Sequence, residues 1–169
     1  MRTSTTGQQD WSRLQTRIIV PANVAQIQPR LIGHGPATIW VDDFALQARA
    51  NLASARRQDM AGTLTITNST LTITIETSDA SLKVEDRRTG RRWSQKPVAQ
   101  EVFLLDAKAD SRQAELKLLH AASGLEMSAK LRLALDVPEL SVELDAQGEL
   151  PSALRFPYAF NSGPGDYLV

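Results

Sequence analysis

The strictest constraint on this chain is a regular alternation of apolar and polar residues over positions 124–145. Every second residue of its first half is apolar, namely Leu125, Met127, Ala129, Leu131, Leu133 and Leu135. Successive side chains of a strand point to opposite faces, so this pattern predicts a strand with one apolar and one polar face. A helix is the competing interpretation, but helical spacing from Leu125 meets Ser128 and Arg132, so a period of two fits better.

The alternation resumes after a short turn that contains Pro138. Apolar residues then occupy positions 140, 142 and 144, with Ser141, Glu143 and Asp145 beside them. Two alternating runs joined by a short Pro-containing turn are typical of an antiparallel hairpin. The segment therefore predicts two neighbouring strands of one sheet.

Strand patterns are also dense between residues 62 and 121. Leu64 and Ile66 alternate with threonines, and the segment 70–75 repeats that pattern after a turn at Asn68-Ser69. Further strands are expected at 82–85, 98–105 and 112–121, although 114–122 also fits a helix. Short strands at intervals of about 8–12 residues with turn signals between them indicate an all-β, antiparallel β-sandwich.

The first third of the chain has a weaker pattern of the same kind. β-Branched and alternating residues predict strands near 18–20, 26–32 and 37–46, a small sheet that would be marginal alone. The stretch 48–61 is rich in Ala, Arg and Gln and lacks alternation, which indicates a linker or a short helix. We therefore expect a partial sheet over 1–47, a linker over 48–61 and a β-sandwich over 62–169.

The overall composition excludes several classes of function. Nineteen basic and nineteen acidic residues balance, whereas nucleic-acid-binding proteins usually carry a basic surplus. The chain has no cysteine, which excludes disulfides and thiol chemistry. No apolar run approaches the roughly 20 residues that span a membrane, and the start lacks the apolar core of a signal peptide. We expect neither a nucleic-acid nor a membrane partner, and the localisation stays unknown.

Two segments near the start resemble the last strands of a jelly-roll carbohydrate-binding module. These are Gln15–Ala22 and Gly35–Leu46, the second of which contains an aromatic residue followed by Asp42-Asp43. The front half of such a jelly roll is missing from this chain. In these modules an Asp at this place helps to hold a structural calcium ion, so the resemblance implies that Asp43 is a metal ligand. The alternative is a solvent-exposed turn or a cap.

Residues 62–169 are similar to the β-sandwich, related to galactose mutarotase, that precedes the catalytic barrel of large bacterial glycosidases. The similarity rests on the Thr-rich double strand, on Leu82–Trp93 and on the closing stretch Phe156–Val169. It implies an internal fragment of a glycoside hydrolase, cut in one domain at the front and in another at the back. The parent would be secreted or periplasmic, and the expected partners are a carbohydrate and the remainder of the parent chain.

Exposed aromatic side chains are the expected contacts for sugars, whose C–H faces stack on rings. We select Trp40, Trp93 and Tyr158, with core packing or a role in capping the sandwich as the alternative for each. No nucleophile motif or assignable carboxylate pair occurs, so no catalytic residue is named and no cofactor other than the calcium is expected. His34 and His120 are too few and too distant in sequence to suggest a metal site.

The resemblances favour a non-catalytic β-sandwich region of a carbohydrate-active enzyme, which would scaffold a barrel and contact glycan. One alternative is a sugar mutarotase, which needs a histidine and a carboxylate in a groove, and His120 is the candidate histidine. Another alternative is a structural or adhesion domain such as a surface repeat. The sequence contains no internal repeat, which makes this alternative weaker.

Overall fold

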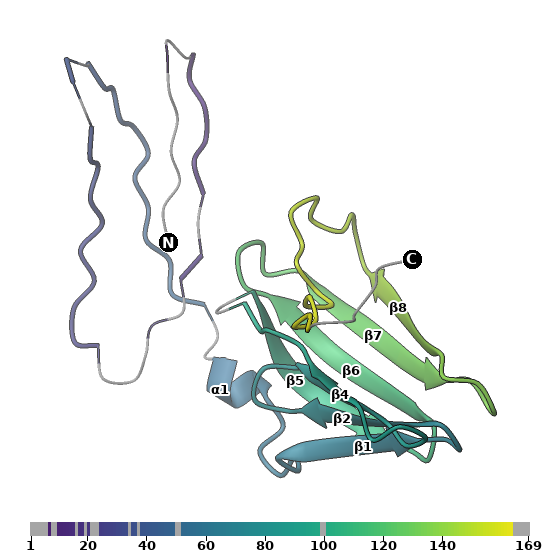
Figure 1. Cartoon of the computed structure of the whole chain (residues 1–169). Helices are drawn as coiled ribbons and strands as arrows, with labels where there is room; N and C mark the ends of the chain where they lie inside the picture. Colours follow the sequence, from purple (N-terminus) through teal and green to yellow (C-terminus); the bar gives the residue numbers. More distant parts are fainter. Residues whose placement is uncertain are drawn as a thin grey trace.

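The structure, a computed structural model, describes residues 7, 10–15, 17–18, 20, 24–33, 35–36, 38–49, 52–98 and 101–163. These residues form an all-β fold of two four-stranded antiparallel sheets (Figure 1), which confirms the expected β-sandwich. The one helix among them is α1 (Leu52–Ala55), a single turn within the stretch expected to be a linker or a short helix.

Both sheets are built from strands that follow one another along the chain. The first sheet contains β1 (Thr63–Thr67), β2 (Leu71–Glu76), β3 (Leu82–Asp86) and β4 (Arg92–Ser94). The second contains β5 (Val102–Ala109), β6 (Gln113–His120), β7 (Glu126–Leu133) and β8 (Leu140–Ala146). The predicted hairpin is thus β7–β8, and the ambiguous segment around Ala114 is a strand, not a helix.

One apolar core lies between the two sheets. The alternating residues of β2, β6 and β7 supply most of it, and Ile66, Ile73, Leu118 and Leu131 are at most 1% exposed. Each of these side chains lies on the face that its strand's alternation predicts. Burial of this apolar face is the main source of stability that the alternation encodes.

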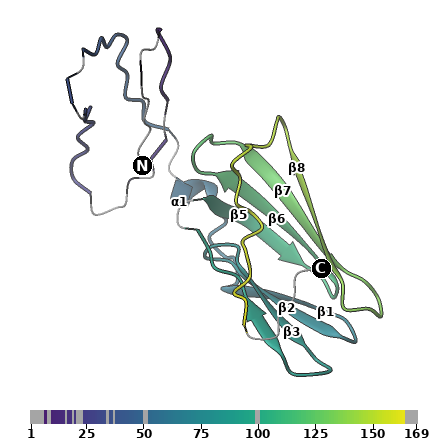
Figure 2. The same ribbon diagram turned by 45° about the horizontal axis from the view of Figure 1, so that its top comes forward.

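The C-terminal segment joins the sheets by crossing from the second to the first (Figure 2). It then runs beside the end of β4, where the amide of Lys96 donates to the carbonyl of Ala159 at 2.9 Å. The amide of Asn161 donates to the carbonyl of Ser94 at the same distance, 2.9 Å. The segment therefore extends the first sheet past β4.

The small sheet expected over residues 1–47 is not present in the described part of that segment. The described residues of 26–32 and 38–46 contain no strand, and neither Ile18 nor Val20 belongs to one. Their apolar side chains are exposed, for example Ile39 at 57% and Phe44 at 69%. Strand formation needs a paired neighbour and a covered face, and local alternation supplies neither. Ile19, His34 and Ala37 lie outside the described residues.

No helix among the residues described is long and apolar enough to cross a membrane.

Candidate functional site

The outer face of the first sheet carries a regular array of polar side chains. Outward positions of β1 and β2 are threonines because both strands alternate Thr with Leu or Ile. The antiparallel register aligns these threonines with the charged residues of β3 and β4. Two cross-strand rows result, Thr65–Thr74–Lys83–Ser94 and Thr67–Thr72–Glu85–Arg92. We call these eight residues the threonine face.

A shallow hollow of about 380 Å³ lies on the threonine face. Its lining consists of Thr72, Thr74, Lys83, Val84, Glu85, Arg92, Trp93 and Ser94. Val84 and Trp93 are paired, and this pair lies between the two outward-facing pairs Lys83–Ser94 and Glu85–Arg92. Since successive side chains of a strand point to opposite faces, Val84 and Trp93 point to the inner face. The outward hydroxyl and charged groups of the other six lining residues surround the hollow.

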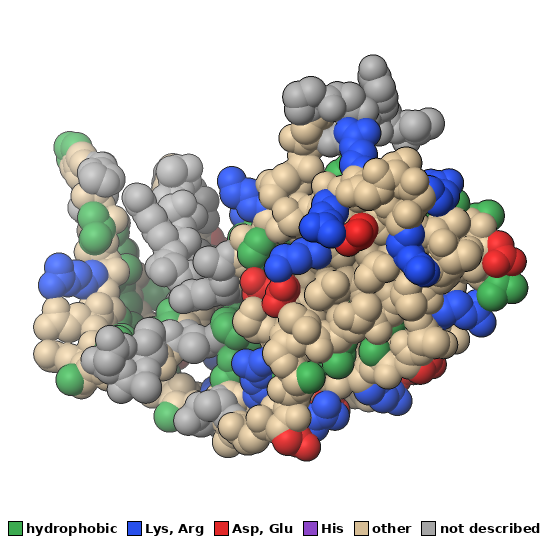
Figure 3. Space-filling view, turned by 60° about the horizontal axis from the view of Figure 1, so that its bottom comes forward, with side chains coloured by type: hydrophobic (Ala, Val, Ile, Leu, Met, Phe, Trp, Pro, Cys, Tyr) green, Lys and Arg blue, Asp and Glu red, His purple; other side chains and the backbone are tan. Residues whose placement is uncertain are grey.

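The charges around this hollow are held in pairs of opposite sign. Lys83 Nζ lies 2.6 Å from a carboxylate oxygen of Glu76, and Arg92 Nε lies 3.1 Å from one of Glu85. From below, a broad area of uncharged side chains and backbone is flanked by basic and acidic side chains (Figure 3). The face is close to neutral and rich in both donors and acceptors of hydrogen bonds.

Trp93, one of the predicted sugar contacts, lies on the short edge strand β4 and is partly exposed. The guanidinium carbon of Arg91 lies 5.4 Å from the centre of its ring, within the range of a cation–π contact. Trp93 therefore borders the hollow, and its indole is oriented toward the inner side of the sheet.

Tyr158, another predicted sugar contact, is a core residue in the structure. Its side chain is 3% exposed, and its ring meets that of Phe156 edge-to-face with centroids 5.5 Å apart. The phenol donates to the carbonyl of Asp79 at 3.2 Å, and burial raises the pKa of Tyr158 to about 12. The expectation of a sugar platform is wrong here because the C-terminal segment folds back between the sheets, a contact that sequence alternation does not encode.

Trp40 and Asp43 both lie in the described part of the N-terminal segment, outside the sandwich. The Trp40 side chain is 79% exposed, so its ring is open to solvent. The backbone of Asp43 has a positive φ of 52°, and its amide donates to the Asp42 carboxylate at 2.8 Å. Within the described ranges, no group of three or more His, Cys, Asp or Glu side chains could hold a metal ion. Calcium binding by Asp43 stays a prediction that depends on ligands outside those ranges.

His120 has a carboxylate neighbour that the sequence did not reveal. Its Nε2 lies 3.9 Å from Oε1 of Glu101, and both side chains are mostly buried. The other ring nitrogen, Nδ1, lies 2.8 Å from the Ser123 hydroxyl and accepts from the Ser123 amide at 3.3 Å. Glu101 also accepts from the Arg155 amide at 2.8 Å. The cluster closes the β6–β7 turn and anchors the C-terminal segment.

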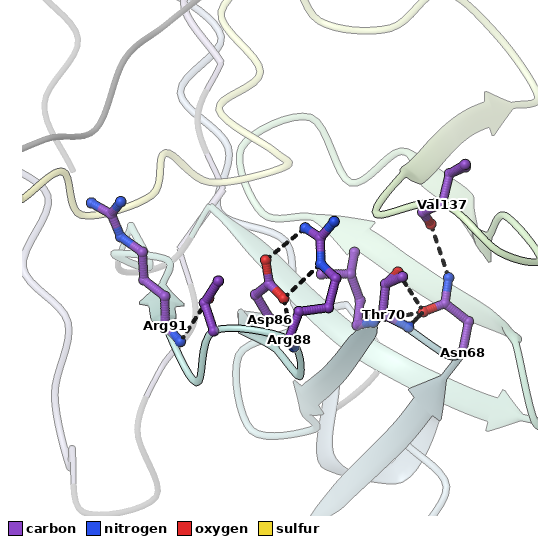
Figure 4. Close-up of polar contacts among 8 residues, drawn as sticks. Asn68, Thr70, Asp86, Arg88, Arg91 and Val137 are labelled. Carbon is purple, nitrogen blue, oxygen red and sulfur yellow. Dashed lines mark hydrogen bonds and ion pairs between the residues drawn. The ribbon is translucent and has the colours of Figure 1, made fainter.

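The turn between β3 and β4 contains an acid whose ionised form is strongly favoured. Asp86 accepts from the amide, Nε and one terminal nitrogen of Arg88 at 2.7–3.0 Å (Figure 4). The Arg88 guanidinium lowers the pKa of Asp86 to about 2. The contact joins the last residue of β3 to a residue inside the turn that follows, so it shapes that turn and does not create a reactive group.

Because the folded pKa of Asp86 lies below its ordinary value of 3.8, ionised Asp86 stabilises the fold at neutral pH. We expect this contribution to be complete above about pH 4 and to disappear as pH falls toward 2. Asp86→Asn should lower the melting temperature at pH 7. At pH 2 the melting temperatures of the variant and the unchanged protein should differ less. Thermal melts of both proteins across this range test the prediction, and a pH-independent difference would contradict it.

Comparison of the chain with protein-family models, curated proteins and solved structures gives no match. The class that the fold itself defines is an antiparallel β-sandwich of two four-stranded sheets. A functional assignment must therefore be argued from the threonine face and from the individual side chains above.

Proposed function

We propose that this chain is a non-catalytic β-sandwich region of a carbohydrate-active enzyme, a glycoside hydrolase, and that it contacts glycan through the threonine face. The observation that carries the proposal is the shallow hollow walled by aligned hydroxyl groups and paired charges. The similarity of residues 62–169 to the sandwich that precedes glycosidase barrels supports the same function.

The chemistry of the hollow suits a hydroxyl-rich polymer. Thr72, Thr74 and Ser94 can each donate and accept, and Glu85 and Arg92 offer an acceptor and a donor side by side. Sites for small molecules usually enclose most of the ligand surface in a concave apolar cavity. An open, shallow hollow on a sheet face, with hydroxyl and charged groups around it, instead fits a segment of a longer chain that lies across the strands.

A sugar mutarotase remains the second candidate, and the His120–Glu101 pair is the observation that favours it. The separation of 3.9 Å between Nε2 and Oε1 provides the histidine and carboxylate that such an enzyme needs. Both side chains are at most 13% exposed, and His120 Nδ1 is engaged by Ser123. Polarimetry of freshly dissolved glucose and galactose tests this candidate, and clear acceleration lost in His120→Ala would favour it over the non-catalytic function.

Glycan binding is tested by titrating the protein with xylan, cellulose, starch and pectin oligosaccharides of about six sugars, with chemical shifts as the readout. We expect Thr74→Val to weaken binding about three- to tenfold, because one hydroxyl contact is lost in a side chain of similar shape. Arg92→Ala should weaken it by a similar factor.

The matched control for this titration is Thr63→Val, which removes an outward hydroxyl from the same sheet outside the hollow. It should leave the affinity unchanged. Binding that is indifferent to Thr74→Val and Arg92→Ala, or the absence of binding to every glycan, would contradict the role proposed for this face.

A further inference from the structure

The strand β8 has an edge that no other strand pairs with in the part of the chain that the structure describes. The second sheet ends at β8, whose only strand partner there is β7. The amide of Ala134 donates to the carbonyl of Glu139, directly beyond the last pair of that ladder. In antiparallel sheets, hydrogen-bonded and non-hydrogen-bonded residue pairs alternate along the ladder. Since Ala134 and Glu139 are hydrogen-bonded, the main-chain N–H and C=O groups of Leu140, Val142 and Leu144 point away from β7. A row of donors and acceptors is thus available at this edge.

The apolar face of β8 is also incompletely covered. On β7 the inward residues Leu131 and Leu133 are 1% and 4% exposed. On β8 the inward residues are only partly buried, although they pack against the same core, and this row comprises Leu140, Val142, Leu144 and Ala146. One more strand beside β8 would cover this row and extend the core in the direction of the sheet.

The outer face of the second sheet specifies the charge that such a strand should carry. A single row of directly opposed residues crosses all four strands, in the order Lys108, Glu115, Lys130 and Glu143. The sign alternates at every step, and Lys108 Nζ lies 2.8 Å from a carboxylate oxygen of Glu115. The row ends at the edge on an acidic residue, and Asp145 lies on the same face of β8. Opposite charges at facing positions stabilise a sheet. A residue of an added strand that lies opposite Glu143 should therefore be Lys or Arg.

We propose that the β8 edge binds an extended peptide segment in which basic residues alternate with apolar ones. The segment adds a fifth strand to the second sheet: its main chain pairs with Leu140, Val142 and Leu144, and its apolar residues cover their side chains. Its Lys or Arg lies opposite Glu143 and continues the charge row. Main-chain pairing supplies affinity in this mode of recognition, and the alternating side chains supply specificity. This inference is independent of the threonine face, which lies on the other sheet.

A second copy of β8 is a poor occupant of the same edge. Antiparallel self-pairing centred on Glu143 places Glu143 opposite its own copy. Self-pairing centred on Leu144 places Glu143 opposite Asp145 of the other copy. Centring on Val142 places Glu139 opposite Asp145. Facing like charges destabilise a sheet, so each register is disfavoured.

The test uses the full chain and two synthetic peptides, N-acetylated and C-amidated, that alternate valine with either lysine or glutamate over about seven residues. We expect the lysine peptide to bind with an affinity that falls as salt rises, and to slow hydrogen exchange at the amides of Val142 and Leu144. The glutamate peptide should bind at least tenfold more weakly.

Two variants of the edge and one control make the test specific. Glu143→Lys should reverse the preference between the peptides, whereas Glu149→Lys makes the same charge change outside the strand and should not. Val142→Pro removes an outward amide that β7 does not use and should abolish peptide protection while β7–β8 pairing persists. Equal binding of the two peptides, protection that survives Val142→Pro, or dimerisation through β8 in sedimentation experiments would each overturn the proposal.

Discussion

Replacing Leu131 by Asp is expected to unfold the sandwich or to lower its free energy of unfolding by about 4–5 kcal/mol. Leu131 is 1% exposed and lies in the middle of β7, opposite Val142 on the apolar face. A carboxylate placed there loses its water and gains no partner, and the contacts of the leucine side chain are lost as well. Since whole domains are stable by only about 5–15 kcal/mol, this single change is a large fraction of the total.

The adjacent residue provides the matched control, because Arg132 lies on the same strand with its side chain exposed. Arg132→Asp should change stability by no more than about 0.5 kcal/mol. Urea denaturation of both variants, followed by circular dichroism, measures the difference. Similar losses of stability in the two would show that the inward and outward faces of β7 have been assigned wrongly.

Replacing Asn68 by Ala is expected to cost about 3 kcal/mol, an unusually large effect for a turn residue. Its amide nitrogen donates to the carbonyls of Ala134 and Val137, at 2.6 and 3.0 Å, in the turn between β7 and β8. Its amide oxygen accepts from the main-chain nitrogens of Thr70 and Leu71, at 2.8 and 2.6 Å. Figure 4 shows this side chain directed from the turn between β1 and β2 toward Val137 in the turn between β7 and β8. Alanine would remove all four hydrogen bonds at a position where Asn68 is 7% exposed, although the Val137 carbonyl would keep the amide of Glu139 as a donor.

The neighbouring Ser69 is exposed, so Ser69→Ala in the same turn should be nearly neutral. Differential scanning calorimetry of both variants distinguishes a general sensitivity of the turn from the specific contacts of Asn68. A melting temperature for Asn68→Ala close to that of Ser69→Ala would show that the bridge between the sheets contributes little.

The strands of the sandwich could be located from the sequence because their signal is local. In β7 and β8 every second residue is apolar, and those residues face the core. The same reasoning separated the threonines of β1 and β2 from the buried Ile66 and Ile73. Alternation indicates which face of a strand is buried. In a sandwich this is enough to assign the inward and outward side chains of each strand.

The candidate site was less accessible to sequence reasoning because it depends on register. Each threonine was visible in the sequence, but only antiparallel pairing brings Thr74 beside Lys83 and Thr72 beside Glu85. The contact of His120 with Glu101 likewise joins the β6–β7 turn to the start of β5. Tyr158 was selected for its chemistry alone, and its burial follows from the path of the C-terminal segment.

The sequence by itself determined the class of fold, the β7–β8 hairpin and the turn at Asn68, because each follows from residues close together in the chain. The tertiary structure decided the lack of strands in the described part of the N-terminal segment, where alternation is present and no paired neighbour stabilises it. It also decided the hydrogen bonds from Asn68 to the turn between β7 and β8, and the charge row that ends at Glu143. Pairing and burial depend on groups distant in sequence, and a local pattern specifies which side chains need partners without specifying where those partners are.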